Sequence, residues 1–199
     1  KLHRLVSTPS QTSATEAGAF QVRAIGPFGG VQDYAEGASG LSLLVAGGVG
    51  ITPISALAAT ATQVVHQGRH RALRLVWVAR ELQLFLEFAP LLERLAAAPN
   101  IDAHVRLYLT GATADTGDSA EAEMGIRIAG FTVHRERPNL TTLVGTALRE
   151  LVDADPQTAT TSGVSAFCCG PAPVEALVRA ECDSFQGTAV AFTSLNFAL

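Results

Sequence analysis

Runs rich in apolar residues recur along the chain and are separated by segments of helical spacing. The longest of them lie at residues 41–46, 73–79, 103–109 and 164–169. A run without apolar/polar alternation is typical of a strand buried on both faces, as in a parallel sheet. Shorter strands are predicted at residues 20–25, 131–135 and 188–192.

Apolar residues return every three or four positions between these runs, which predicts helices. The predicted helices span residues 53–65, 84–97, 139–152 and 174–183. Strands that alternate with helices form right-handed βαβ units and a parallel sheet. We therefore expect an α/β fold: a three-layer, Rossmann-like domain with a mostly parallel five-stranded sheet. Ligands of such sheets bind at the carboxyl ends of the strands, where the strand order reverses.

Composition supports one well-buried domain and excludes several classes of function. Of the 199 residues, 48% are hydrophobic and 16% are charged, which favours a packed interior over disorder. The net charge of -4 gives no basic footprint for nucleic acid. The three cysteines and five histidines show neither a disulfide framework nor the spacing of metal ligands, so no metal site is expected. The Gly-x-Ser-x-Gly elbow of many hydrolases does not occur.

The segment from residue 47 to residue 53 joins the first long strand to the first helix and reads Gly-Gly-Val-Gly-Ile-Thr-Pro. Glycines permit positive φ and let a phosphate approach the backbone, and a helix N-terminus offers free N–H groups. Thr52 adds a hydroxyl donor, and Pro53 stands where the common Rossmann fingerprint has Gly or Ala. The segment predicts a pyrophosphate site, and the alternative is a tight turn without a ligand.

Three other strand ends carry residues suited to a dinucleotide. Arg80 follows the second long strand, where an arginine can pair with a ribose 2′-phosphate, and Arg137 offers a second cation. The alternative for Arg80 is a surface residue paired with Glu81 or solvent. Cys169 closes the fourth long strand, either beside a hydride donor or as a buried structural cysteine. Two arginines at strand ends favour NADPH over NADH.

Five motifs occur in a fixed order, and together they resemble the C-terminal dehydrogenase region of the ferric reductase and NADPH oxidase family. They are Gly-Pro-Phe-Gly at 26–29, the glycine segment at 47–53, Trp-Val-Ala-Arg at 77–80, Arg-Pro-Asn at 137–139 and Cys-Gly-Pro at 169–171. This family belongs to the ferredoxin-NADP reductase superfamily, so the resemblance implies the NADP-domain type of α/β fold.

The resemblance also implies a reaction, in which NADPH passes a hydride to FAD and electrons cross a membrane through haems to oxygen or ferric iron. Cys169 would flank the nicotinamide, and Phe197 resembles the near-terminal aromatic that covers the flavin ring. These two are the candidate catalytic residues. The residues expected to bind the cofactors are Gly26, Pro27, Phe28, Gly29, Gly47, Gly48, Gly50, Ile51, Thr52, Pro53, Arg80, Arg137, Pro138, Asn139, Cys169, Gly170 and Pro171.

The chain departs from the family because its FAD motif, of the His-Pro-Phe or Arg-x-Tyr-Ser type, is absent from the sequence. Residues 1–30 are interpreted as the last strands of an FAD-binding barrel plus a linker. Residues 31–199 are interpreted as the NAD(P)H-binding domain, with an acidic insertion at 111–125. We expect the flavin domain and the haem-bearing transmembrane domain to be partners in a longer parent chain.

The resemblance therefore implies a soluble portion at the cytoplasmic face of a membrane protein. A cytosolic regulator is a further expected partner, at the acidic insertion. Two alternatives stay open: a soluble flavin reductase or ferredoxin reductase-like module, and a regulatory domain that binds a nucleotide without turnover. The sequence does not decide between oxygen and ferric iron as the final acceptor.

Overall fold

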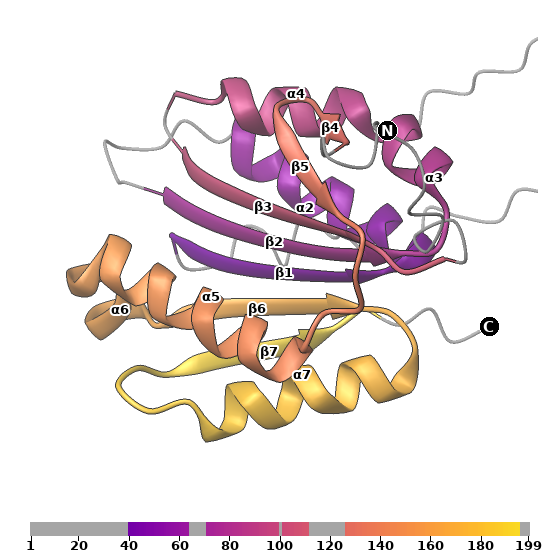
Figure 1. Cartoon of the computed structure of the whole chain (residues 1–199). Coiled ribbons are helices and arrows are strands. Elements are labelled where there is room, and N and C mark those ends of the chain that lie inside the picture. Colours follow the sequence, from indigo (N-terminus) through magenta and orange to yellow (C-terminus); the bar gives the residue numbers. More distant parts are fainter. Residues whose placement is uncertain (1–39, 64–70, 100, 112–125, 196–199) are drawn as a thin grey trace, which may run out of the picture.

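A seven-stranded sheet with helices on both faces forms the centre of the molecule (Figure 1). The computed structural model describes residues 40–63, 71–99, 101–111 and 126–195. The strands are β1 (Leu41–Gly47), β2 (Arg71–Ala79), β3 (Ile101–Leu109), β4 (Arg127–Ile128), β5 (Phe131–His134), β6 (Val164–Cys169) and β7 (Val190–Ser194). The predicted barrel remnant and nearly all of the predicted acidic insertion lie outside the described residues.

The sheet has the order β4-β5-β3-β2-β1-β6-β7, and only the β4–β5 pair is antiparallel. The predicted class and the mostly parallel sheet are confirmed. The predicted count of five strands was wrong, because short strands extend both edges. β4 has only two residues and pairs with β5 across a turn in which Ala129 and Gly130 both have positive φ. Two residues are too few to produce a periodic pattern in the sequence.

Helices form the outer two layers. Above the sheet in Figure 1 lie α2 (Ile51–Gln63), α3 (Leu82–Glu87) and α4 (Ala89–Ala97), and a 3-10 turn η1 (Gly48–Gly50) precedes α2. Below it lie α5 (Leu140–Ala154), α6 (Pro156–Ser162) and α7 (Ala172–Ser184). The single helix predicted at 84–97 is two helices, because Pro90 in the first turn of α4 requires a new helix start. The short helix α6 was not predicted.

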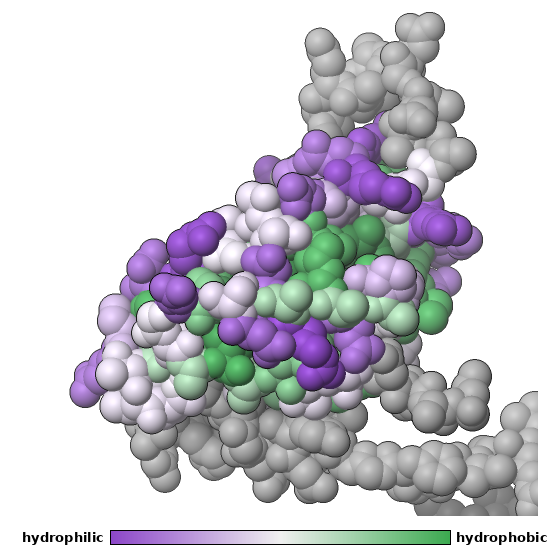
Figure 2. All heavy atoms as spheres, turned by 90° about the horizontal axis from the view of Figure 1, so that it is seen from below, coloured by the Kyte–Doolittle hydropathy of each residue, from purple (hydrophilic) through white to green (hydrophobic). Residues whose placement is uncertain are grey.

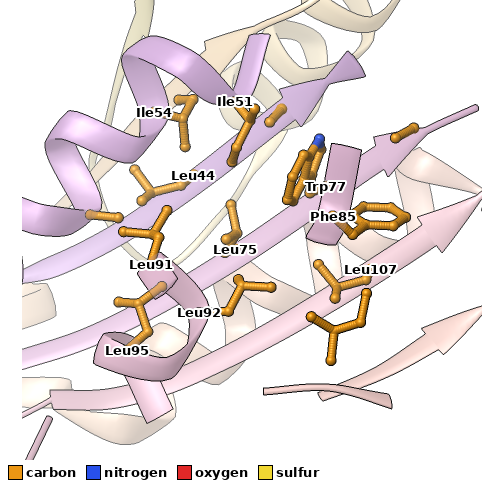
Figure 3. Close-up of a cluster of buried hydrophobic side chains, with 14 of the residues drawn as sticks. Leu44, Ile51, Ile54, Leu75, Trp77, Phe85, Leu91, Leu92, Leu95 and Leu107 are labelled. Atoms are coloured by element: carbon orange, nitrogen blue, oxygen red, sulfur yellow. The ribbon is translucent and has the colours of Figure 1, made fainter. Parts of the chain in front are cut away.

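Each helical layer buries its own apolar cluster against the sheet. On the upper face, Leu44, Leu75 and Leu107 from three neighbouring strands face Ile54 of α2 and Leu92 of α4 (Figure 3). On the lower face, the members come from β1, β6, α5 and α7, and include Leu43, Val45, Leu148, Cys168 and Val178. Long apolar runs were readable in the sequence because both faces of the central strands are covered.

A charged cluster on the lower face fixes α5 to the sheet. Arg74 of β2 is 2% exposed and lies 2.7 Å from the Asp102 carboxylate and 3.2 Å from the Glu150 carboxylate of α5. Arg106 of β3 donates a hydrogen bond to the Glu150 carboxylate. Burial opposes ionisation of Glu150, but Arg106, Arg74 and His104 outweigh it and lower the pKa of this carboxyl. The cluster therefore holds the helix whose N-terminus borders the candidate site.

Helix α7 covers β6 and β7 with a face that is partly charged. The Arg179 guanidinium carbon lies 4.4 Å from the ring centroid of Phe192 on β7, and Glu175 pairs with Arg179 one turn away. Figure 2 views the molecule from this side and shows apolar surface beside strongly hydrophilic side chains. The charged groups thus border, and partly cover, the apolar surface at this edge of the sheet.

The loops after β1 and β6 touch backbone to backbone. A Cβ atom on Gly50 would lie 2.1 Å from the Cys169 carbonyl oxygen. A Cβ on Gly47 would lie 2.8 Å from Cδ of Pro171 and 3.2 Å from Cα of Gly170. Close contact therefore requires glycine at both positions. At Gly48 the reason is different, since Gly48 has φ +55° and no described residue beyond its chain neighbours lies within 4 Å of a Cβ placed there.

These two reasons predict different costs for two alanine variants. Gly50→Ala forces the loops apart, and we expect a loss of about 3 kcal/mol in the free energy of unfolding. Gly48→Ala keeps the contacts and costs only the left-handed backbone, about 1 kcal/mol. Urea unfolding of the three proteins measures both. Equal losses would show that the contact between the loops does not constrain the fold.

Candidate functional site

A cleft of about 650 Å³ opens at the carboxyl ends of β1, β2 and β3. Its walls come from the glycine loop after β1, the Arg80–Glu81 segment after β2, Thr110 after β3 and the starts of α5 and α7. β2 lies on one side of β1 and β6 on the other, so the strand order reverses between β1 and β6. This is where doubly wound sheets bind ligands, and where the sequence predicted the site.

The predicted phosphate loop divides into residues that line the cleft and residues that support it. Gly47 and Gly48 line the cleft, together with Val49, which is 75% exposed. Gly50 is buried against the end of β6, and Ile51 is fully buried in the upper core. Gly50 and Ile51 therefore shape the loop from behind.

The start of α2 completes this loop. The Thr52 hydroxyl donates a hydrogen bond to the Val49 carbonyl at 3.0 Å, and Pro53 is buried. Thr52 is exposed, but its hydroxyl closes the local turn. The first turn of α2 contains no acidic residue, which leaves the positive end of the helix uncompensated by side chains.

The structure brings Arg80 and Arg137 into the same cleft. The sequence separates them by more than fifty positions, but β5 pairs with β3 and β3 with β2, so their strand ends are close. Both side chains are exposed, and within the described part of the chain neither has an ion-pair partner. The predicted alternative, a pairing of Arg80 with Glu81, is not observed there.

Backbone contacts fix the end of β2 that carries Arg80. Thr110 donates its N–H to the Ala79 carbonyl at 2.8 Å, and a Cβ on Gly111 would lie 2.0 Å from the Arg80 carbonyl. Next to Arg137, Pro138 also lines the cleft. Asn139 has another function, because its side chain accepts a hydrogen bond from the Thr142 N–H at 3.2 Å and caps α5.

Cys169 is 7% exposed and is not among the residues that line the cleft. Its thiol donates to the Leu195 carbonyl at 3.4 Å. Burial, and secondarily the Glu175 carboxylate, raise the pKa of this thiol above its usual range. Burial raises the pKa of neighbouring Cys168 further, to about 12. Gly170 packs on Gly47, and Pro171 both lines the cleft and caps α7.

Several residues of the cleft were not predicted as site residues. Glu81 was considered only as a partner for Arg80, yet its position directly after the strand end was a usable signal. The apolar members of the wall are Val78, Leu84, Leu140, Pro173, Val174 and Leu177. Val78 belongs to β2 and to the motif at 77–80, whereas the others come from α3, α5 and α7, at positions that carry no distinctive motif. The predicted contacts at Gly26, Pro27, Phe28, Gly29 and Phe197 lie outside the described residues.

The described residues form neither a metal-binding group nor a membrane-spanning helix. Among the described residues, no three His, Cys, Asp or Glu side chains are grouped so that they would hold a metal ion. In the same residues, no helix has the length and apolar character needed to cross a membrane.

Comparisons with known proteins give one family and several distant structures. The sequence model of the ferric reductase NAD binding domain matches residues 42–183. A flavohemoglobin from Malassezia yamatoensis, crystallised with FAD and heme, is 18% identical with a TM-score of 0.47, over 80% of this chain and 32% of that one. An intact type IV self-sufficient cytochrome P450 monooxygenase is 16% identical with a TM-score of 0.42, over 81% of this chain and 15% of that one.

No curated protein matches the chain. The chain spans about a third of the flavohemoglobin and a smaller share of the monooxygenase. The family model, by contrast, covers β1 to the penultimate residue of α7, which includes the whole described cleft. The family resemblance read from the five motifs is confirmed, and the chain belongs to the ferric reductase NAD-binding domain family.

Proposed function

We propose that this chain binds NADPH in the cleft and orients the nicotinamide for hydride transfer to an FAD held mainly by a neighbouring flavin domain. The observation that carries the proposal is the meeting of the glycine loop with Arg80 and Arg137 in one cleft, where neither arginine has an ion-pair partner among the described residues. In the parent protein, the haems of a membrane domain would pass the electrons on to oxygen or ferric iron. This chain would then lie at the cytoplasmic face, where a cytosolic regulator can reach it.

The glycine loop fits a pyrophosphate. Gly48 lines the cleft, and a Cβ at this position would meet no atom of the described residues within 4 Å apart from its chain neighbours, which leaves room for a ligand beside the backbone there. The N-terminus of α2 adds the positive end of a helix dipole without an acidic side chain to oppose it. Phosphate oxygens accept hydrogen bonds from such backbone N–H groups.

The remaining walls fit the other parts of the dinucleotide. Arg80 and Arg137 are placed to hold the 2′-phosphate by charge-assisted hydrogen bonds. Pro171, Val174 and Leu177 offer apolar contact to the uncharged rings. When bound, NADPH supplies a hydride and FAD accepts it, while the residues of this chain contribute orientation and exclusion of water.

Cys169 contributes a neutral, polarisable group near the inner end of the cleft. Its raised pKa keeps the thiol protonated at neutral pH, so no negative charge develops beside the site of hydride transfer. The hydrogen bond to the Leu195 carbonyl holds the sulfur in place. We propose that Cys169 flanks the nicotinamide in this protonated form.

Removing the two arginines tests cofactor choice. Arg80→Ala and Arg137→Ala should each weaken NADPH binding about tenfold to a hundredfold, the value of a hydrogen bond between charged groups. NADH lacks the 2′-phosphate, so its dissociation constant should change less than about threefold. Calorimetric titration and the rise in melting temperature with added cofactor measure both. Arg94→Ala, at an exposed position of α4 outside the cleft, is the matched control and should change neither; equal losses for NADPH and NADH would remove the assigned role.

Removing the charge of Glu81 should have the opposite effect. Glu81 lines the same cleft, and its negative charge would oppose that of the 2′-phosphate. Glu81→Gln should tighten NADPH binding about threefold at low salt, the size expected for an exposed charge interaction. The gain should fall as ionic strength rises, and NADH binding should not improve. Glu87→Gln, at an exposed position of α3 that does not line the cleft, is the control. A gain that is the same for both cofactors would place Glu81 away from the 2′-phosphate.

The thiols provide a test of the protonated state of Cys169. All three pKa values are raised by burial, so the reactive thiolate is scarce at neutral pH. A disulfide exchange reagent at pH 7 should react slowly with the native protein and then with three thiols per chain after unfolding. The rate at Cys169 should rise with pH, and bound NADPH should reduce it. Rapid labelling of Cys169 at pH 7 would contradict a neutral thiol.

A further inference from the structure

The most specific contact to the glycine loop comes from a core side chain rather than from the cleft. Trp77 of β2 is fully buried, and its indole N–H donates a hydrogen bond to the Gly48 carbonyl at 3.0 Å. A buried indole N–H needs a partner. Strand or helix groups satisfy most such donors, but here the acceptor is the residue of the phosphate loop that has a positive φ.

The Gly48 carbonyl accepts hydrogen bonds from two N–H groups. The N–H of Ile51, at the start of α2, also bonds to the Gly48 carbonyl. Trp77 is a fully buried member of the upper cluster, so its indole reaches the Gly48 carbonyl from the core side of the loop. The carbonyl oxygen of Gly48 is thereby kept toward the core and away from the cleft.

This orientation determines the other side of the same peptide group. A trans peptide is planar, and its C=O and N–H point in opposite directions. Since the Gly48 carbonyl is directed at Trp77, the Val49 N–H must be directed away from the core. Gly48 and Val49 both line the cleft, so this N–H is available to an anion there. Rotation of the peptide would instead present the carbonyl oxygen, which repels phosphate.

Trp77 is itself fixed by neighbouring rings. Phe85 of α3 meets it edge to face, with centroids 4.6 Å apart at 80°, and Phe88 does so at 5.7 Å and 84°. Figure 3 shows Trp77 and Phe85 side by side, with the indole nitrogen at the edge of the cluster. The helix that carries Phe85 also supplies Leu84 to the cleft. The Trp77–Phe85 pair therefore links the glycine loop, through α3, to the part of the cleft wall that Leu84 forms.

We propose that Trp77 is a positioning residue for pyrophosphate binding: its indole N–H sets the Gly48–Val49 peptide so that the N–H faces the ligand. This inference rests on the proposed binding of a dinucleotide. It adds that affinity for the pyrophosphate depends on one buried hydrogen bond, which no ligand touches. A role in core packing alone would predict loss of stability without a selective loss of pyrophosphate binding.

The test uses the full chain and removes the hydrogen bond without removing the ring. Trp77 is the sole tryptophan, so expression in a tryptophan auxotroph can replace it with β-(3-benzothienyl)alanine, in which sulfur stands where the indole has N–H. Trp77→Phe is the genetic counterpart. Leu95→Val, in the same core cluster, is the control for a loosened core, because Leu95 lies on α4 and does not line the cleft.

Two ligands separate the parts of the site. NADP⁺ contains the pyrophosphate, whereas adenosine 2′-monophosphate contains the 2′-phosphate without it. Loss of one net hydrogen bond should raise the dissociation constant for NADP⁺ about fivefold to tenfold in both Trp77 proteins. Binding of adenosine 2′-monophosphate should stay within about twofold, and Leu95→Val should change neither constant. In the unmodified protein, NADP⁺ but not adenosine 2′-monophosphate should shift the single indole N–H resonance.

The outcomes distinguish this inference from the function on which it rests. If NADP⁺ binds the unmodified and the benzothienyl proteins equally, the positioning role of Trp77 is wrong while the proposed function stands. Equal weakening of both ligands, or weakening by Leu95→Val as well, also overturns it, because the effect would then follow core stability. If neither ligand binds the unmodified chain, the proposed function itself fails.

Discussion

The fold and the site depend on one backbone contact, where the loop after β1 meets the loop after β6. Parallel pairing of β1 with β6 brings the two strand ends together, and a Cβ on Gly50 would overlap the Cys169 carbonyl. The same approach places Gly47 against Gly170 and Pro171. Only residues without a side chain allow the sheet to continue across this point. The requirement explains why two glycine-containing motifs far apart in the sequence belong to one structure.

This contact also explains why the loop can be both rigid and open. Its inner side is closed by Cys169, Ile51 and Trp77, all buried. Its outer side consists of Gly47, Gly48 and Val49 facing the cleft. In the proposed complex, a phosphate would meet backbone groups whose directions are set by the packing of the core, and little conformational entropy would be lost on binding.

The sequence predicted the class of fold and the place of the site, because both follow from strong local signals. Apolar runs marked the central strands, and glycines with strand-end arginines marked the cleft. The parts that it did not predict depend on spatial neighbours. Strand β4 is too short for a pattern, and the role proposed for Trp77 depends on the acceptor opposite its nitrogen. A tryptophan in an apolar run is indistinguishable from any core aromatic until that acceptor is known.

The positions and pairing of the arginines explain how a chain with a net charge of -4 would hold an anionic cofactor. Arg74 and Arg106 are engaged by the carboxylates of Asp102 and Glu150, so they fix α5 and are not available to a ligand. Arg80 and Arg137 have no carboxylate partner in the described chain, and both lie in the cleft. In the proposed complex, a phosphate of the ligand would be the counter-ion of these two arginines. Since the net charge of the chain is negative, attraction of an anion would have to be local, and in the proposed complex the selectivity between NADPH and NADH would depend on these two arginines against Glu81.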